Sequence, residues 1–361
     1  MKSPKLLSAV AVASAAIFLS ANAQDPEPDD SAATDPVGYN STTLVDGTDT
    51  LIGVTFQDVA SLRGVVSSVT SGSVGLSGVT AGSGFAGTHY LLVLGGSLEG
   101  RWFPITSVGD GSVTVEDDLE SLGLIVETAV SIIPFWTLGE LLGEANGVPV
   151  SDDLLAPKAF VFINDLSESG TNLSAGFVFV LHDGSQLGGG EVGWFEDGTF
   201  LPSDDVLVSP ESYITVRNVS GADSTLTIAG DVPITTVGIS VGRIANEAQD
   251  NRITNPFPVS LTLGQSGLES VVDVSTDLLN PTDRLLVFTS ENDALNPSPS
   301  AVYVYHDGSQ IGGGTPGWYS DGTFVLSDDV EIPAGAPLIV RKADGLPGLG
   351  SWLPPIPYTL D

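Results

Sequence analysis

The chain has 361 residues, of which 45 are Asp or Glu and 11 are Lys or Arg, so its formal net charge at pH 7 is −34. A chain this acidic lacks the cations that neutralise phosphates, which excludes nucleic acids as partners and makes anionic membranes repulsive. It contains no Cys, which excludes a disulfide framework and a zinc–thiolate site, while its 42% apolar residues are enough for a buried core.

The first 23 residues have the pattern of a secretory signal peptide. Lys2 and Lys5 precede an apolar stretch, and Ala21-Asn22-Ala23 is a small-x-small cleavage site. The apolar stretch, of about 15 residues, is shorter than the ~20 that span a bilayer. We therefore expect an exported chain that starts at Gln24, has no transmembrane segment after cleavage, and resides outside the cell, on its surface or in the periplasm.

The next segment, residues 24–40, is rich in Asp, Glu and Pro, which predicts a flexible acidic linker. Short β-branched runs then alternate with Gly, Asn, Asp and Ser, as in strands joined by tight turns. We expect strands at 50–56, 64–70, 73–79, 89–95, 101–106, 112–116 and 124–133, and a short helix at 136–143. Such spacing of turns predicts an all-β fold of antiparallel sandwich or barrel modules.

The strongest feature is an internal repeat. Residues 177–218 align without a gap with residues 301–342, and 22 of the 42 positions are identical. The shared blocks are His-Asp-Gly-Ser-Gln, Gly-Gly-Gly, Gly-Trp, Asp-Gly-Thr-Phe and Ser-Asp-Asp-Val. Upstream, the apolar run that starts at Phe160 aligns with the run that starts at Leu286, with a connection two residues shorter in the second copy. The sequence therefore predicts an internal duplication.

These patterns divide the chain into six segments. They are a signal peptide (1–23), a flexible acidic linker (24–40), lead-in strands with a β-barrel-like insert (41–155), the first β module (156–230), lead-in or connecting strands (231–282) and the second β module (283–361).

A resemblance rests on the order of motifs. Trp-Thr-Leu-Gly at 136–139, a hydrophobic strand, an aromatic strand ending near Gly-Trp and a Val-Arg strand resemble a family of secreted bacterial proteins of unknown function that carry paired β modules. The resemblance covers nearly the whole chain after the signal peptide. It implies no activity, so the functional expectations depend on the residues alone.

Two motifs resemble enzyme signatures, but the residues around them are not those that the enzymes require. Gly188-x-Gly190-x-x-Gly193 and its copy match a dinucleotide-binding motif, but an aromatic pair and Asp-Gly follow where that motif needs a helix. Asp-Gly-Thr, at Asp197 and again in the second copy, has a different residue order from the aspartic-protease motif and is typical of a turn. His182 and His306 alternate onto the face of the repeated valines, which favours core positions next to a turn.

Two sets of repeated side chains are candidate binding residues. The aromatic set, a possible platform for sugar or peptide or else a module core, is Trp194, Phe195, Trp318 and Tyr319. The acidic set, a possible Ca²⁺ site in each module or else solvated turn acids, is Asp197, Asp204, Asp205, Asp321, Asp328 and Asp329.

The sequence predicts no catalytic residues. The favoured function is a non-enzymatic exported scaffold or attachment protein of the envelope, matrix or cell surface, with an extracellular protein or glycan as partner. One alternative is a Ca²⁺-dependent glycan- or protein-binding module. A second alternative is a hydrolase or lyase of extracellular polysaccharide that uses Glu196 and Asp197 as acid and base. Glu196 is Ser320 in the other copy, which weakens this last alternative.

Overall fold

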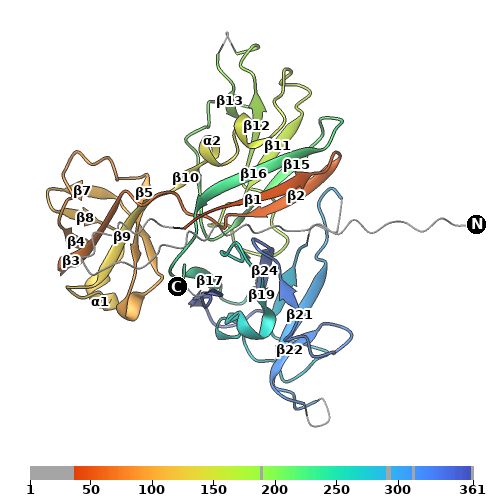
Figure 1. Ribbon diagram of the computed structural model, residues 1–361. Helices are drawn as coiled ribbons and strands as arrows, with labels where there is room; N and C mark the ends of the chain where they lie inside the picture. The colour runs from red at the N-terminus through yellow and green to blue at the C-terminus, as the bar shows by residue number, and fades with distance from the viewer. Residues whose placement is uncertain (1–35, 188–189, 290–293, 311–313, 359–361) are drawn as a thin grey trace, which may run out of the picture. The chain divides into compact units, whose positions relative to one another are not determined.

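The computed structural model describes residues 36–187, 190–289, 294–310 and 314–358 (Figure 1). Strands hold 40% of the residues and helices 6%, and the paired strands run antiparallel, so the predicted all-β fold is confirmed. No helix in these four ranges is long and apolar enough to cross a membrane. The expected signal peptide and most of the expected linker lie outside the described residues.

Module 1 is built on a five-stranded antiparallel sheet with the strand order β13-β12-β11-β15-β2. These strands are β2 (Thr48–Gly53), β11 (Ala159–Ile163), β12 (Phe177–His182), β13 (Gly193–Glu196) and β15 (Tyr213–Asn218). The edge strand β2 precedes the insert in the sequence and pairs with β15, where Thr50 lies opposite Val216. One of the expected lead-in strands therefore completes the sheet of this module.

Module 2 has a sheet with the same order, β22-β21-β20-β24-β18. Its strands are β18 (Gln249–Thr254), β20 (Arg284–Val287), β21 (Ala301–His306), β22 (Gly317–Ser320) and β24 (Pro337–Lys342). The registers agree as well, because His182 lies opposite Gly193 in module 1 and His306 lies opposite Gly317 in module 2. The two repeated segments therefore form sheets with the same strand order and the same pairing.

The register corrects one detail of the sequence alignment. Val161 lies opposite Val216 and Phe179, and Leu285 lies opposite their counterparts Val340 and Tyr303. The ungapped offset of 124 residues therefore extends through β11 and β20, and the expected two-residue shortening is wrong. A two-residue shift leaves every side chain on the same face of a strand, so hydrophobic alternation did not distinguish the two alignments.

A second layer of short strand pairs covers each sheet. In module 1 these are β1 (Val37–Leu44) with β16 (Ser224–Asp231), and β10 (Trp136–Thr137) with β14 (Leu207–Val208). In module 2 they are β17 (Ile239–Arg243) with β25 (Gly348–Trp352), and β19 (Leu261–Thr262) with β23 (Glu331–Ile332). Because β1 begins at Val37, the last residues of segment 24–40 belong to a strand.

The insert forms the third part of the described chain. It contains β3 (Leu62–Thr70), β4 (Ser73–Leu76), β5 (His89–Val93), β6 (Trp102–Pro104), β7 (Ser107–Gly109), β8 (Ser112–Thr114) and β9 (Ala129–Pro134). These strands form one sheet in the order β6-β5-β9-β3-β4-β8-β7, which curls into a half-barrel (Figure 1). Its concave side buries Val66, Leu91, Val113 and Ile132 completely.

A short helix follows the insert at the predicted place. It is α2 (Leu138–Leu141), and Thr137 and Glu140 form a capping box at its start. Leu138 and Leu141 pack into the core of module 1, and the carbonyl of Leu142 accepts a hydrogen bond of 3.0 Å from Nε1 of Trp194.

The equivalent tryptophan of module 2 has no such bond. Trp318 is fully buried, but its Nε1 has no hydrogen-bond partner among the described residues. The carbonyl of Ser266, after the short 3-10 helix at this place, accepts instead from Nε1 of Trp352, at 2.8 Å. The two cores therefore share one shape and differ in the polar contacts of their largest side chains.

This difference predicts unequal effects of the same substitution. Trp194→Phe leaves the Leu142 carbonyl without its donor, whereas Trp318→Phe removes an unpartnered N–H group. We expect Trp194→Phe to lower the free energy of unfolding by about 1–2 kcal/mol more than Trp318→Phe. Urea denaturation of both variants measures this, and an equal or larger loss for Trp318→Phe would contradict it.

Candidate functional site

The two histidines hold equivalent turns in the interior. His182 and His306 end β12 and β21 and are fully buried. Their Nδ1 atoms accept the backbone N–H groups of Gly184 at 2.9 Å and Gly308 at 2.8 Å. Because Nδ1 is an acceptor, the proton of the neutral ring lies on Nε2, which has no partner among the described residues. Both histidines therefore support turns.

A serine pairs with each histidine, and the sequence patterns described above did not predict this pairing. Ser151 bridges to His182 and Ser275 bridges to His306, each as a short parallel pairing. A repeated motif marks both serines in the sequence, because Ser-x-Asp-Leu-Leu-x-Pro occurs at 151–157 and again at 275–281, at the same offset of 124 residues.

The aromatic candidates lie inside the modules. Trp194, Trp318 and Tyr319 have exposed fractions of 0%, 1% and 2%, and Phe195 is half-buried. A platform for a sugar ring needs an exposed ring face. Three of the four rings are core residues, so their burial favours the second of the two interpretations that the sequence left open, a module core.

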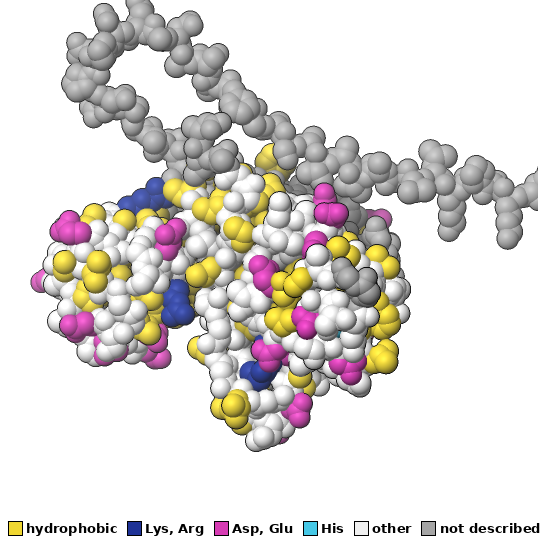
Figure 2. All heavy atoms as spheres, turned by 90° about the horizontal axis from the view of Figure 1, so that it is seen from below, with side chains coloured by type: hydrophobic (Ala, Val, Ile, Leu, Met, Phe, Trp, Pro, Cys, Tyr) yellow, Lys and Arg dark blue, Asp and Glu magenta, His cyan; other side chains and the backbone are white. Residues whose placement is uncertain are grey.

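The acidic candidates do not converge. Asp204 and Asp328 accept the backbone N–H groups of Trp194 and Trp318 at 2.9 and 2.7 Å, and Asp321 forms an ion pair of 2.9 Å with Arg284. The other three, Asp197, Asp205 and Asp329, are exposed. Acidic side chains are scattered over the face shown in Figure 2, and no three His, Asp or Glu side chains of the described ranges gather as a metal site.

The residues that the structure does bring together are an aspartate and an arginine in each sheet. Asp49 in β2 and Arg217 in β15 form two hydrogen bonds of 2.6 and 2.8 Å, and Asp250 and Arg341 form two of 2.7 and 2.8 Å. The carboxylates are 3% and 1% exposed. These hydrogen bonds raise the pKa of each guanidinium above its ordinary value, so both arginines stay charged.

Each pair is capped by the other module. Asn296, between β20 and β21, donates its N–H to Asp49 at 2.7 Å and accepts from Arg217 at 3.4 Å. Asn172, between β11 and β12, donates its backbone N–H to Asp250 at 2.7 Å, and its side-chain oxygen accepts from Arg341 at 2.9 Å. We call these two equivalent sets, Asp49/Arg217/Asn296 and Asp250/Arg341/Asn172, the clasps.

The backbone completes both clasps. The N–H of Asp49 donates to the carbonyl of Ala294 at 3.0 Å, and the N–H of Asp250 donates to the carbonyl of Gly170 at 2.8 Å. Asn172 and Asn296 have φ values of 53° and 49°, a left-handed conformation that Asn tolerates better than most residues. Each module thus provides hydrogen-bond partners for backbone and side-chain groups at an edge strand of the other.

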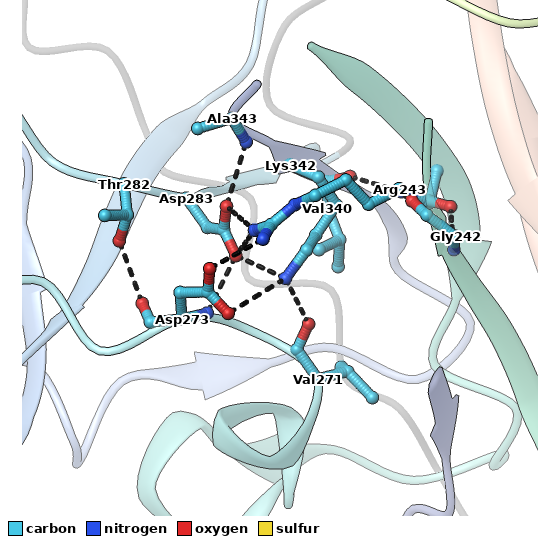
Figure 3. A network of polar contacts seen from close by, with 10 residues as sticks. Gly242, Arg243, Val271, Asp273, Thr282, Asp283, Val340, Lys342 and Ala343 are labelled. Atoms are coloured by element: carbon cyan, nitrogen blue, oxygen red, sulfur yellow. Dashed lines mark hydrogen bonds and ion pairs between the residues drawn. The ribbon is translucent and has the colours of Figure 1, made fainter. Parts of the chain in front are cut away.

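A buried ion network distinguishes module 2 (Figure 3). The side chain of Asp283 is completely buried and forms an ion pair with Lys342. It forms a second ion pair with Arg243, at 2.8 Å, and Arg243 also pairs with Asp273 at 2.7 Å. Lys342 donates to the carbonyl of Val271 at 2.8 Å, and the N–H groups of Asp273 and Ala343 donate to Asp283. The two cations balance the two acids.

Module 1 has uncharged residues at the corresponding positions. By register, Arg243, Asp283 and Lys342 correspond to Leu44, Ala159 and Asn218. Asn218 is buried and donates to the carbonyls of Leu44 and Ala222, each at 2.8 Å. The fold therefore does not require charges at this place.

This comparison predicts how the network responds to substitution. Asp283→Ala leaves Lys342 and Arg243 without their shared buried acid, and we expect a loss of about 3–5 kcal/mol in the free energy of unfolding. Adding Arg243→Leu and Lys342→Asn, the residues of module 1, is expected to recover most of that loss. Denaturation of the single and triple variants measures it; a triple variant less stable than the single one would refute the interpretation.

Glu211 is a half-buried acid outside the clasps. It precedes β15, and its Oε1 accepts from the N–H and the hydroxyl of Ser240, each at 3.2 Å. Burial raises the pKa of Glu211 from 4.5 to about 7, against the opposing effect of the Ser240 hydrogen bonds. Glu211 therefore titrates near neutral pH in the folded chain.

The raised pKa of Glu211 predicts a pH dependence. The folded state holds the proton more tightly than the unfolded state, so the contribution is fully present below pH 4.5 and is lost as pH rises through about 7. Relative to Glu211→Gln, the parent is expected to lose at most about 3 kcal/mol over this window. Urea denaturation between pH 4.5 and 8 measures this, and equal slopes for both proteins would contradict it.

Comparisons with known proteins add no assignment, because no family model, curated protein or solved structure matches the chain. The resemblance to secreted bacterial proteins with paired modules stays a prediction from the sequence.

Proposed function

We propose that the chain is a non-enzymatic, exported scaffold or attachment protein of the envelope, matrix or cell surface, and that its two modules are copies of one duplicated unit. The reciprocal clasps are the observation that carries this proposal. They join edge strand β2 of module 1 to the β20–β21 connection of module 2, and edge strand β18 of module 2 to the β11–β12 connection of module 1. Such mutual capping suits a protein that must transmit load or hold a fixed spacing.

The filled cores support the same proposal. Both repeated tryptophans are inside the modules, and the repeated histidines hold turns. The acid–base pair of the hydrolase alternative gains no support, since Glu196 is bonded to Thr199 at 2.5 Å while Asp197 is exposed. Of the three expected functions, a structural role agrees best with the burial of the tryptophans and the turn contacts of the histidines.

The coupling of the modules gives a direct prediction. Asn172→Gly with Asn296→Gly removes the side-chain oxygens that accept hydrogen bonds from Arg341 and Arg217. The backbone N–H groups that donate to Asp250 and Asp49 remain, and the left-handed backbone stays accessible. We expect the single cooperative unfolding transition of the parent to split into two, with the first midpoint lowered, because each clasp loses the hydrogen bond that its arginine donates to the other module. Calorimetry measures this. Asn246→Gly, at φ 61° and outside the clasps, is the matched control and should keep one transition.

The biological role is tested with the same variants. After fractionation of the producing cells, the parent is expected in the envelope or extracellular fraction, starting at Gln24, and to co-sediment with isolated envelopes. The double Asn→Gly variant should be exported but bind envelopes more weakly than Asn246→Gly. A chain that stays inside the cell, or that degrades extracellular polysaccharide, would overturn the proposal. Stronger envelope binding in CaCl₂ than in MgCl₂ at matched ionic strength would favour the Ca²⁺-dependent alternative.

A further inference from the structure

A cavity of about 380 Å³ lies where the two modules meet on one side. Module 1 contributes the segment 165–169, Leu173 and Glu211, and module 2 contributes parts of β17, β18 and β25. Ligand sites in proteins commonly have volumes of about 300–1,000 Å³, so the cavity has room for a small molecule.

The cavity contains a buried cation that forms no ion pair within the described ranges, although the carboxylate of Asp165, which also lines the cavity, interacts with it electrostatically. Arg252 in β18 is 7% exposed and donates to Oδ1 of Asn164 at 2.7 Å and to the carbonyl of Ser174 at 2.9 Å. Both acceptors are neutral, and no ion pair of Arg252 occurs within the described ranges. A buried charge without an ion pair costs stability, and both acceptors belong to module 1, so Arg252 links the two modules as well as lining the cavity.

The other copy shows that the fold does not need these polar groups. By register, Arg252 corresponds to Leu51, and at the offset of 124 residues Asn164 corresponds to Phe288 and Glu211 to Gly335. Leu51 and Phe288 are apolar, and Gly335 has no side chain. The polar groups of the cavity therefore stand where the two modules differ.

The chemistry of the lining limits the ligand. Arg252 offers N–H donors, Glu211 offers a carboxyl group, and Ser167 and Ser169 offer hydroxyls. Acids and arginines both line the cavity, and the whole chain carries a net charge of −34, which disfavours anions. Leu173 and Leu349 add apolar surface. Mixed donors and acceptors beside apolar side chains match a hydroxylated ring with one apolar face.

We propose that this cavity is a binding site for a neutral sugar of one or two pyranose rings, with Arg252 and Glu211 hydrogen-bonded to its hydroxyl groups. The site lies on residues that differ between the modules and that are not members of the clasps, although Arg252 and Glu211 each also hydrogen-bond to the other module. Binding at this place links both modules, since Glu211 belongs to one and Arg252 to the other.

Titration calorimetry on the full chain tests the proposal, with methyl glucoside, methyl galactoside, N-acetylglucosamine and cellobiose as probes and glycerol, acetate and glucuronate as comparisons. At least one neutral sugar is expected to bind saturably, and at least tenfold more weakly to Arg252→Leu. Arg284→Leu, which breaks an ion pair with Asp321 outside the cavity, should bind as the parent does.

A second variant keeps the test independent of Arg252. Gly348 lines the cavity, and a Cβ built on it meets no atom within 4 Å, so Gly348→Trp is expected to fold and to occupy the cavity. Sugar binding should be lost in this variant. The proposal is overturned if no neutral sugar saturates the parent, if only acetate or glucuronate binds, or if Gly348→Trp binds the sugar as tightly as the parent.

Discussion

The ion pair between an aspartate of an edge strand and an arginine of its neighbour is the interaction on which the two-module arrangement depends. Asp49 and Asp250 are nearly fully buried, and a buried carboxylate is stable only when it is paired and fully hydrogen-bonded. The arginine of the same module supplies two hydrogen bonds, and the backbone N–H of Asn172 or Asn296 supplies another from the other module. Neither module completes its own carboxylate, so separating them exposes two incompletely bonded charges.

The two similar sheets also distinguish the positions at which both modules agree from the positions at which they differ. Positions that agree in both modules hold turns, cores and clasps, as the pairs His182/His306 and Trp194/Trp318 do. Some positions that differ carry charge in one module only, namely Glu211 in module 1, and the network around Asp283 and the cavity residue Arg252 in module 2. Buried charge is costly, and module 1 folds with apolar or amide groups at the same places.

The sequence predicted the all-β class, most strands of the insert and the short helix near Leu138, because each of these has a local pattern of alternation or capping. It left open whether the repeated tryptophans were core or platform, since alternation alone does not show which face is covered. The clasps had no local signal: Asp49 and Arg217 are 168 residues apart, and Asn296 comes from the other module. The cavity had none either, because its lining joins segments from both modules.

Native-state hydrogen exchange tests the central claim, that mutual completion of the clasps makes the two modules one cooperative unit. Amides of the paired central strands, β11 with β15 in module 1 and β20 with β24 in module 2, should exchange with the same free energy of opening and the same dependence on denaturant. If one sheet opens at a clearly lower free energy while the other stays protected, the modules are independent and the account is wrong.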